Sequence, residues 1–190
     1  SVPEDYALGL ALQVEDDSNL VAYGNGFDNI SLLIRALGVA TEGGTLVRGH
    51  PGSLFSPRPA WYGVDDSPDS PHFIARCEAI MTINSSVGFE AMLMGKPVTL
   101  LGESSFQFIA QAETREEFLA RMTFYLFAYL VPMHLLDDVD YLQFRLGNPS
   151  EPAIMLRHMV AYGCNPEASA DPDWEDVWGV IRSEVLHAKG

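Results

Sequence analysis

The residues best suited to chemistry lie where an apolar run gives way to small polar residues. The run Ala79–Ile83 is followed at once by Asn84, Ser85 and Ser86, and a helix-like stretch starts at Gly88. A buried strand that opens directly into a helix leaves backbone N–H groups free at the helix start, where the helix dipole favours an anion. The serines add hydroxyl donors, and Gly88 lets a ligand approach the backbone. The pattern predicts a phosphate site, with a plain helix cap by Ser85 or Ser86 as the alternative.

A second candidate follows another short apolar run, Thr45–Arg48, which leads into Gly49, His50 and Pro51. Arg48 and His50 alternate along the chain, so an extended backbone points both to the same face. A histidine at a strand end is able to donate to a phosphate oxygen or to protonate a leaving group. The alternative is a loop histidine before a turn-forming proline.

The third candidate is an acidic cluster directly after the first apolar run, formed by Glu15, Asp16 and Asp17. Three carboxylates next to a buried strand are costly unless they face water, a cation or a reaction. A carboxylate also serves as nucleophile or base at a sugar carbon. Because successive residues of an extended chain alternate faces, Asp16 and Asp17 are expected on opposite sides. A solvated acidic turn is the alternative.

Other chemistry-bearing residues give weaker signals. Glu90 lies four residues after Ser86, on roughly the same side of the expected helix, and suits either a ribose hydroxyl or the surface. The acidic pairs at 65–66 and 137–138 lack the spacing of a metal loop, and the two cysteines are 87 positions apart, at 77 and 164. No metal site is predicted.

The elements that position these residues alternate between strand and helix in the first hundred positions. Continuous apolar runs predict buried strands at 6–14, 45–48, 79–83 and 97–101, with a helix capped by Asp28 or Asn29 and another near Pro71. This is typical of an α/β protein with a parallel sheet of about five strands. The tract 51–71 holds five prolines and is expected to be a loop. Helices alone are expected at 115–131, 138–146, 152–162 and 173–187, with one domain over 1–165 and a helical tail over 166–190.

The composition and net charge of the chain limit the classes of partner that it is expected to bind. The chain has 190 residues, 47% of them apolar, and a net charge of −15, which argues against nucleic acid as a partner. No signal peptide is recognisable at the start of the sequence, and the longest apolar stretch, 122–133, is short for a bilayer span. A cytoplasmic protein is expected.

The three candidate segments, in this order, resemble the capsule polysaccharide synthesis family, which includes bacterial Kdo transferases. The matching stretches are Leu-Ala-Leu-Gln-Val-Glu-Asp-Asp-Ser (10–18), Leu-Val-Arg-Gly-His-Pro (46–51) and Ile-Asn-Ser-Ser-Val-Gly-Phe-Glu-Ala-Met-Leu-Met-Gly-Lys-Pro-Val (83–98). The third stretch is the most specific, and a fainter match covers the helical region 125–145.

The resemblance implies one Rossmann-like half of a glycosyltransferase-B type fold, whose two halves enclose the active site. It implies a CMP-activated ulosonic acid donor such as CMP-Kdo, a glycan or lipid-linked glycan acceptor, and no metal or cofactor. By position, Asp17 matches the nucleophile of a retaining double displacement best and Asp16 is second, with His50 assisting. The donor nucleotide would be bound by the two strand-end motifs and the helix after the second; these residues are Arg48, His50, Pro51, Asn84, Ser85, Ser86, Gly88 and Glu90.

The resemblance also sets expectations beyond the site. A whole two-domain enzyme is about twice this length, so an N-terminal acceptor domain is expected to be missing. Other capsule-assembly proteins at the inner membrane are expected partners, with the protein peripheral to that membrane. Arg48 departs from the lysine common before the His-Pro pair.

Two other functions remain open. UDP-sugar transferases and epimerase relatives also carry a Glu-Ala-X-X-X-Gly-X-Pro-like segment, such as the one that starts at Glu90. They do not usually combine it with a Gln-Val-Glu-Asp-Asp strand end. A non-catalytic nucleotide-binding module is the third possibility.

Overall fold

The computed structural model describes residues 5–39 and 44–164. The chain divides into two compact units, the first ending at Ala110 and the second beginning at Gln111. The sequence predicted one domain over 1–165 instead. The expected tail at 166–190, including the helix at 173–187, lies outside the described residues.

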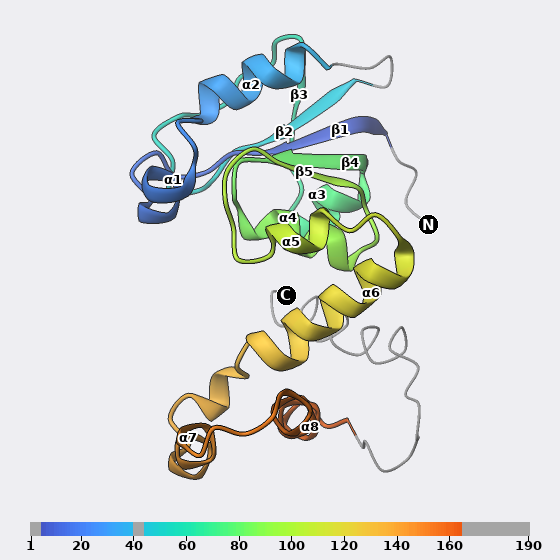
Figure 1. The fold of residues 1–190 in the computed structure, drawn as a ribbon. Helices are drawn as coiled ribbons and strands as arrows, with labels where there is room; N and C mark the ends of the chain where they lie inside the picture. The colour runs from blue at the N-terminus through green and yellow to red at the C-terminus, as the bar shows by residue number, and fades with distance from the viewer. Residues whose placement is uncertain (1–4, 40–43, 165–190) are drawn as a thin grey trace. The chain divides into compact units, whose positions relative to one another are not determined.

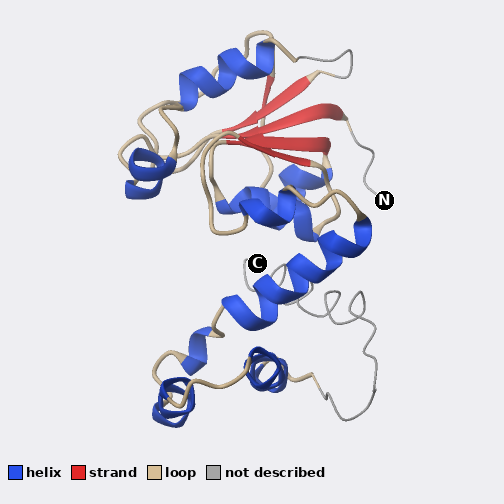
Figure 2. Cartoon of the chain, viewed as in Figure 1, coloured by secondary structure: helices blue, strands red, loops and turns tan. Residues whose placement is uncertain are grey.

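The first unit is built on a five-stranded parallel sheet (Figure 2), which confirms the α/β fold class. The strand order is β3-β2-β1-β4-β5, and every neighbouring pair is parallel. The strands are β1 (Tyr6–Ala11), β2 (Thr45–Arg48), β3 (Gly63–Val64), β4 (Cys77–Thr82) and β5 (Val98–Leu100). Four of them match expected apolar runs. The two-residue strand β3 lies inside the tract expected to be a loop, because so short a strand leaves no periodic signal.

Helices cover both faces of this sheet (Figure 1). One face carries α1 (Ser18–Tyr23) and α2 (Asn29–Leu37), and the other carries α3 (Ser70–Ala75) and α4 (Ser86–Leu93). Alternate residues of β1 point to opposite faces: Leu10 joins the core under α2, and Ala11 joins the core under α3 and α4. A short helix α5 (Gln107–Ala110) follows β5.

Side-chain caps fix where the helices of this unit begin. Asp28, one of the two cap residues expected from the sequence, caps α2, and it also forms a capping box with Ser31. Asp69 caps α3, and Gly95, at a φ of 75°, follows the end of α4. Helices α1 and α4 begin after β1 and β4, with Asp17 and Ser85 as their N-cap residues.

The second unit is helical, as expected. Its elements are α6 (Arg115–Phe124), the π-helix η1 (Tyr125–Tyr129), the 3₁₀ turn η2 (Met133–Leu135), α7 (Val139–Leu146) and α8 (Glu151–Ala161). Within it α8 packs on η1, and the buried His158 ring lies 2.7 Å from the Tyr141 hydroxyl. The run Arg115–Leu135 has 21 residues and a mean hydropathy of 1.3. By length and composition alone it suffices to cross a membrane, but 44% of its most apolar window is buried within the protein, as in a core helix.

Candidate functional site

The three candidate segments all leave the sheet at its carboxyl edge. Ala11 at the end of β1 is opposite Arg48 of β2 on one side and Thr82 of β4 on the other. The chain reverses its direction of strand addition between β1 and β4, and such a switch point is where open α/β sheets bind ligands. The ends of β2 and β4 are two strand spacings apart, about 10 Å. Convergence of His50 with Ser85 and Ser86 on one phosphate stays a prediction.

A buried network of three amide side chains joins the chain after β1 to the chain after β4 and to the start of α2. Gln13 donates to Asn84 Oδ1 (2.8 Å) and accepts from the Asn84 backbone N–H (3.0 Å). Asn29 at the start of α2 bonds to both backbone groups of Gln13. Asn84 also donates to the backbone carbonyl of Asn19, so its side-chain amide is engaged within the protein. Asn84 therefore holds the two strand ends in register and shapes the site.

The start of α4 retains the features of an anion site. Ser85 is the N-cap residue, and its hydroxyl accepts from the Val87 N–H (3.3 Å). Ser86 is exposed, and within the described residues no side-chain hydrogen bond occupies its hydroxyl. The cap alternative thus holds for Ser85, while Ser86 remains available to a ligand.

The role expected for Gly88 is wrong. Gly88 is buried, and a Cβ there would lie 3.0 Å from Leu100 and 3.3 Å from Thr82. The absent side chain lets α4 approach the sheet closely, and the residue faces the core instead of a ligand.

His50 is exposed, and its Nδ1 accepts the Gly52 backbone N–H at 3.0 Å. A neutral His50 therefore carries its proton on Nε2, which makes that nitrogen a donor toward solvent or a ligand. Pro51, which is also exposed, starts the turn that allows this bond. The geometry fits the donor role expected from the sequence.

Arg48 has a different position from the one expected. Its guanidinium pairs with the fully buried Asp65 carboxylate (2.5 Å) and donates to the Ser67 carbonyl. Asp65 also accepts from Arg76 (3.3 Å). Strand β2 ends at Arg48, so the alternation that was expected to align Arg48 with His50 does not extend to the histidine. Arg48 anchors the proline-rich tract and has its charge neutralised there.

The acidic cluster separates into three roles. Glu15 accepts hydrogen bonds from Ser53 Oγ (2.5 Å) and from the backbone N–H groups of Leu54 and Phe55. These bonds, that from Ser53 foremost, lower the pKa of Glu15 to about 2. Glu15 thus fastens the loop that follows His50 to the end of β1.

Asp17 is the N-cap of α1, where it accepts from the Asn19 N–H at 2.7 Å. The chain turns at residues 15–16, with the Asp17 N–H bonded to the Val14 carbonyl. The expectation that Asp16 and Asp17 alternate across an extended chain is therefore wrong. Both are exposed, and no hydrogen bond from the described residues reaches the Asp16 carboxylate.

Glu90 faces α3, where its carboxylate accepts from the Ser70 hydroxyl. This contact joins α3 to α4 and leaves the expected ribose role without support from the geometry. Within residues 5–39 and 44–164, no group of three or more His, Cys, Asp or Glu side chains is arranged to hold a metal.

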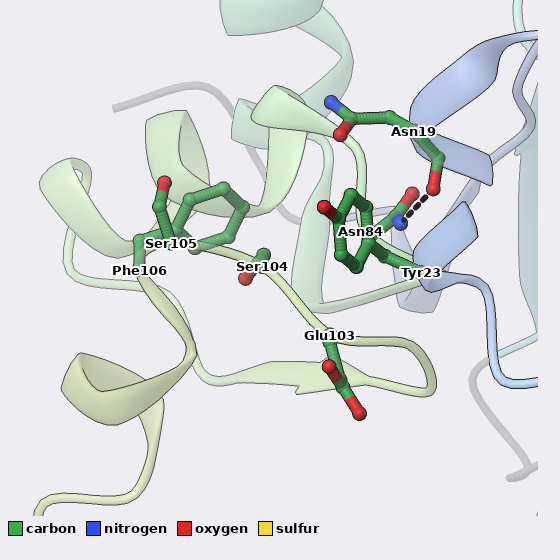
Figure 3. A pocket seen from close by; sticks show the side chains of 7 residues that line it. All are labelled: Asn19, Tyr23, Asn84, Glu103, Ser104, Ser105 and Phe106. Atoms are coloured by element: carbon green, nitrogen blue, oxygen red, sulfur yellow. Dashed lines mark hydrogen bonds between the residues drawn. The ribbon is translucent and has the colours of Figure 1, made fainter.

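A cavity of about 320 Å³ lies beside this edge, at the ends of β4 and β5. It is lined from α1, from the turn after β4 and from the loop after β5 (Figure 3); the residues are Asn19, Tyr23, Asn84, Glu103, Ser104, Ser105 and Phe106. Asn84 connects it to the Ser85-Ser86 turn, whereas His50 does not line it. Its four residues after β5 carry no motif, so the sequence alone did not reveal them.

The comparisons with known proteins agree with the motif after β4. Residues 62–119 match the family model described as "Capsule polysaccharide biosynthesis protein". The matched segment contains β3, α3, β4, α4 and β5, and with them the Asn84-Ser85-Ser86 turn. Over this segment the chain is similar to the capsule polysaccharide biosynthesis family.

Two solved structures are similar in part. One is a Thermosulfurimonas dismutans KpsC, described as a beta Kdo 2,7 transferase, with 22% identity and a TM-score of 0.43 over 53% of this chain. The other is a KpsC from the same organism, described as a beta Kdo 2,4 transferase, with 18% identity and a TM-score of 0.47 over 55% of this chain. The chain spans 34% and 36% of those two proteins. No curated protein matches the chain in sequence.

Proposed function

We propose that this chain supplies the nucleotide-sugar-binding part of a capsule-type glycosyltransferase that uses a CMP-activated ulosonic acid such as Kdo. The observation that carries the proposal is the relationship to the capsule family over 62–119 together with the exposed Ser86 hydroxyl at the start of α4. The acceptor is a glycan or lipid-linked glycan, and the site is cytoplasmic, next to the inner membrane.

The donor phosphate binds at the amino end of α4. Ser86 donates to the phosphate oxygens from its hydroxyl and its backbone N–H, and the helix dipole adds to the attraction. The next two N–H groups of the helix already bond to Ser85. His50 donates from Nε2 as its Nδ1 accepts from Gly52. We do not assign Arg48 or Glu90 to the nucleotide, because Asp65 and Ser70 already engage them.

The transfer is a retaining double displacement. A carboxylate of the acidic cluster forms a bond to the anomeric carbon as the bond from that carbon to the CMP oxygen breaks, and the electron pair leaves with the phosphate. His50 stabilises the charge that develops on the leaving CMP. The acceptor hydroxyl oxygen then forms a bond to the anomeric carbon as the bond from that carbon to the carboxylate breaks, and the hydroxyl proton passes to water.

Two aspartates are candidates for this nucleophile, and the structure suggests how to separate them. Asp17 is oriented by its cap hydrogen bond, while the Asp16 carboxylate is exposed without one. Asparagine is also a good N-cap residue, so Asp17→Asn removes the charge and keeps α1 intact. We expect Asp17→Asn to stop CMP release from CMP-Kdo with CMP affinity retained, and Asp16→Asn to do less harm.

Intact-mass spectrometry after incubation with CMP-Kdo provides the direct observation. The expected result is a sugar adduct that maps to residues 13–18 in the wild type and is missing in Asp17→Asn. Full CMP release by Asp17→Asn would remove Asp17 from the mechanism. Calorimetry with CMP and UDP in the presence of a chelator tests the donor class: tighter binding of UDP would favour a UDP-sugar enzyme.

A further inference from the structure

The cavity after β4 and β5 combines aromatic walls with hydrogen-bonding groups. Tyr23 and Phe106 supply rings on opposite sides of it, with Ser104 between them in the view of Figure 3. Phe106 is 7% exposed and packs against Phe89 at 5.8 Å, so its ring is held in place. Tyr23 is 52% exposed, so its ring is accessible to a ligand. Two aromatic rings that line one cavity are suited to a flat, polar molecule.

Ser104 adds an observation that points to a ligand. Its hydroxyl oxygen is buried, and within the described part of the chain it has no hydrogen-bond partner. Buried polar groups are nearly always paired, so an unpaired one in a cavity wall calls for a missing partner. Because Ser104 lines the cavity, we take a ligand bound there as the missing partner of this hydroxyl.

The charges in the wall exclude a phosphate from the interior. None of the described residues that line the cavity is a lysine, arginine or histidine, and Glu103 contributes an exposed carboxylate. A carboxylate accepts hydrogen bonds from amino and hydroxyl groups and repels carbonyl oxygens and anions. The cavity is therefore suited to a neutral group that carries N–H donors.

The position of the cavity matches the remainder of the donor. Asn84 forms part of the wall, and the next two residues begin the phosphate site at α4. We infer that the cavity is the nucleoside subsite: an aminopyrimidine base inserts between Tyr23 and Phe106, Ser104 bonds to it, and Glu103 selects the amino group. The inference rests on the proposed function and adds residues that neither the motifs nor the family match identifies as ligands.

Base selectivity tests Glu103. The wild type binds CMP about tenfold more tightly than UMP, because uracil presents a carbonyl oxygen where cytosine presents an amino group. Glu103→Gln reduces this ratio to about one, since an amide accepts from cytosine and donates to uracil. Glu78→Gln is the matched control, because Glu78 is exposed near the amino end of β4, at the opposite edge of the sheet. A CMP to UMP ratio that is the same in wild type and Glu103→Gln overturns the assignment.

Two further variants test the Tyr23 ring and the unpaired Ser104 hydroxyl. Tyr23→Leu weakens CMP roughly 5- to 150-fold, the effect of losing one base-stacking ring. Ser104→Ala weakens CMP while the melting temperature of the free protein stays the same or rises, because an unpaired buried hydroxyl is removed. A merely structural serine would give the opposite signature, with lower melting temperature and unchanged affinity.

The outcomes separate this inference from the function on which it rests. CMP binding that depends on Ser86 but not on Tyr23, Glu103 or Ser104 refutes the nucleoside subsite and leaves the phosphate site standing. If the wild type does not bind CMP at all, both the nucleoside subsite and the proposed function are refuted.

Discussion

The ion pair between Arg48 and Asp65 indicates that the arginine of the Arg-Gly-His-Pro motif stabilises the fold and does not bind the donor phosphate. We consider the substitutions Arg48→Met and Asp65→Ala, singly and together. Methionine preserves the apolar stem of Arg48, whose guanidinium lies 5.9 Å from the centre of the Phe73 ring. The variant therefore removes the charge and the hydrogen bonds with little loss of packing.

The structure ranks the two single substitutions. Arg48→Met leaves Asp65 with Arg76 and Ser67 as partners, so the expected loss is that of one charged hydrogen bond, roughly 1.5–3 kcal/mol. Asp65→Ala leaves Arg48 and Arg76 without their shared carboxylate. Breaking a buried pair costs roughly 3–5 kcal/mol, and the low end applies here because Arg48 is 21% exposed and Arg76 24%.

Urea denaturation followed by circular dichroism measures these losses, and the double variant measures the coupling. We expect the double variant to lose less stability than the sum of the single variants, by roughly 0.5–3 kcal/mol. CMP affinity of Arg48→Met is expected to stay within about twofold of wild type, a change of about 0.4 kcal/mol. Unchanged stability together with a tenfold or greater loss of CMP affinity would show that Arg48 binds the phosphate after all.

Three further predictions follow from single contacts. Folding lowers the pKa of Glu15 from 4.5 to about 2, so the stability that Glu15 contributes is present above pH 4.5 and is lost as the pH falls toward 2. The difference in melting temperature between wild type and Glu15→Gln should therefore shrink across this window, and a constant difference would contradict the assignment. Gly88→Ala should destabilise the protein by about 1–2 kcal/mol, because the clash with Leu100 outweighs the gain in helix propensity, and a raised melting temperature would refute this. Burial raises the pKa of the Cys77 thiol to about 12, so a maleimide should label Cys164 first under native conditions; equal labelling would contradict it.

Much of the fold was predictable because its signals are local. Buried parallel strands are continuous apolar runs, and Asp28 and Gly95 mark helix ends through their own backbone geometry. Strand β3 and helix α1 escaped prediction because two and six residues are too few for periodicity to show. Asp16 and Asp17 were expected on an extended chain because the turn at 15–16 has no glycine or proline to signal it.

The site was predictable only where chemistry follows from position along the chain. The strand-end motifs identified Ser86 and His50, which the structure leaves exposed. Arg48 and Glu90 instead form hydrogen bonds with Asp65 and Ser70, which lie 17 and 20 residues away in the sequence. Such pairings arise from tertiary packing, which a single sequence does not display.

The affinity for CMP of wild type and Ser86→Ala, measured by calorimetry with a chelator present, tests the phosphate site at the start of α4. Ser150→Ala is the matched control, since Ser150 is exposed and its hydroxyl makes no cap bond. We expect metal-independent binding that weakens roughly 10- to 150-fold in Ser86→Ala, through the loss of one charge-assisted hydrogen bond, and is unchanged in Ser150→Ala. Equal CMP affinity in the wild type and Ser86→Ala would contradict a phosphate site at the start of α4.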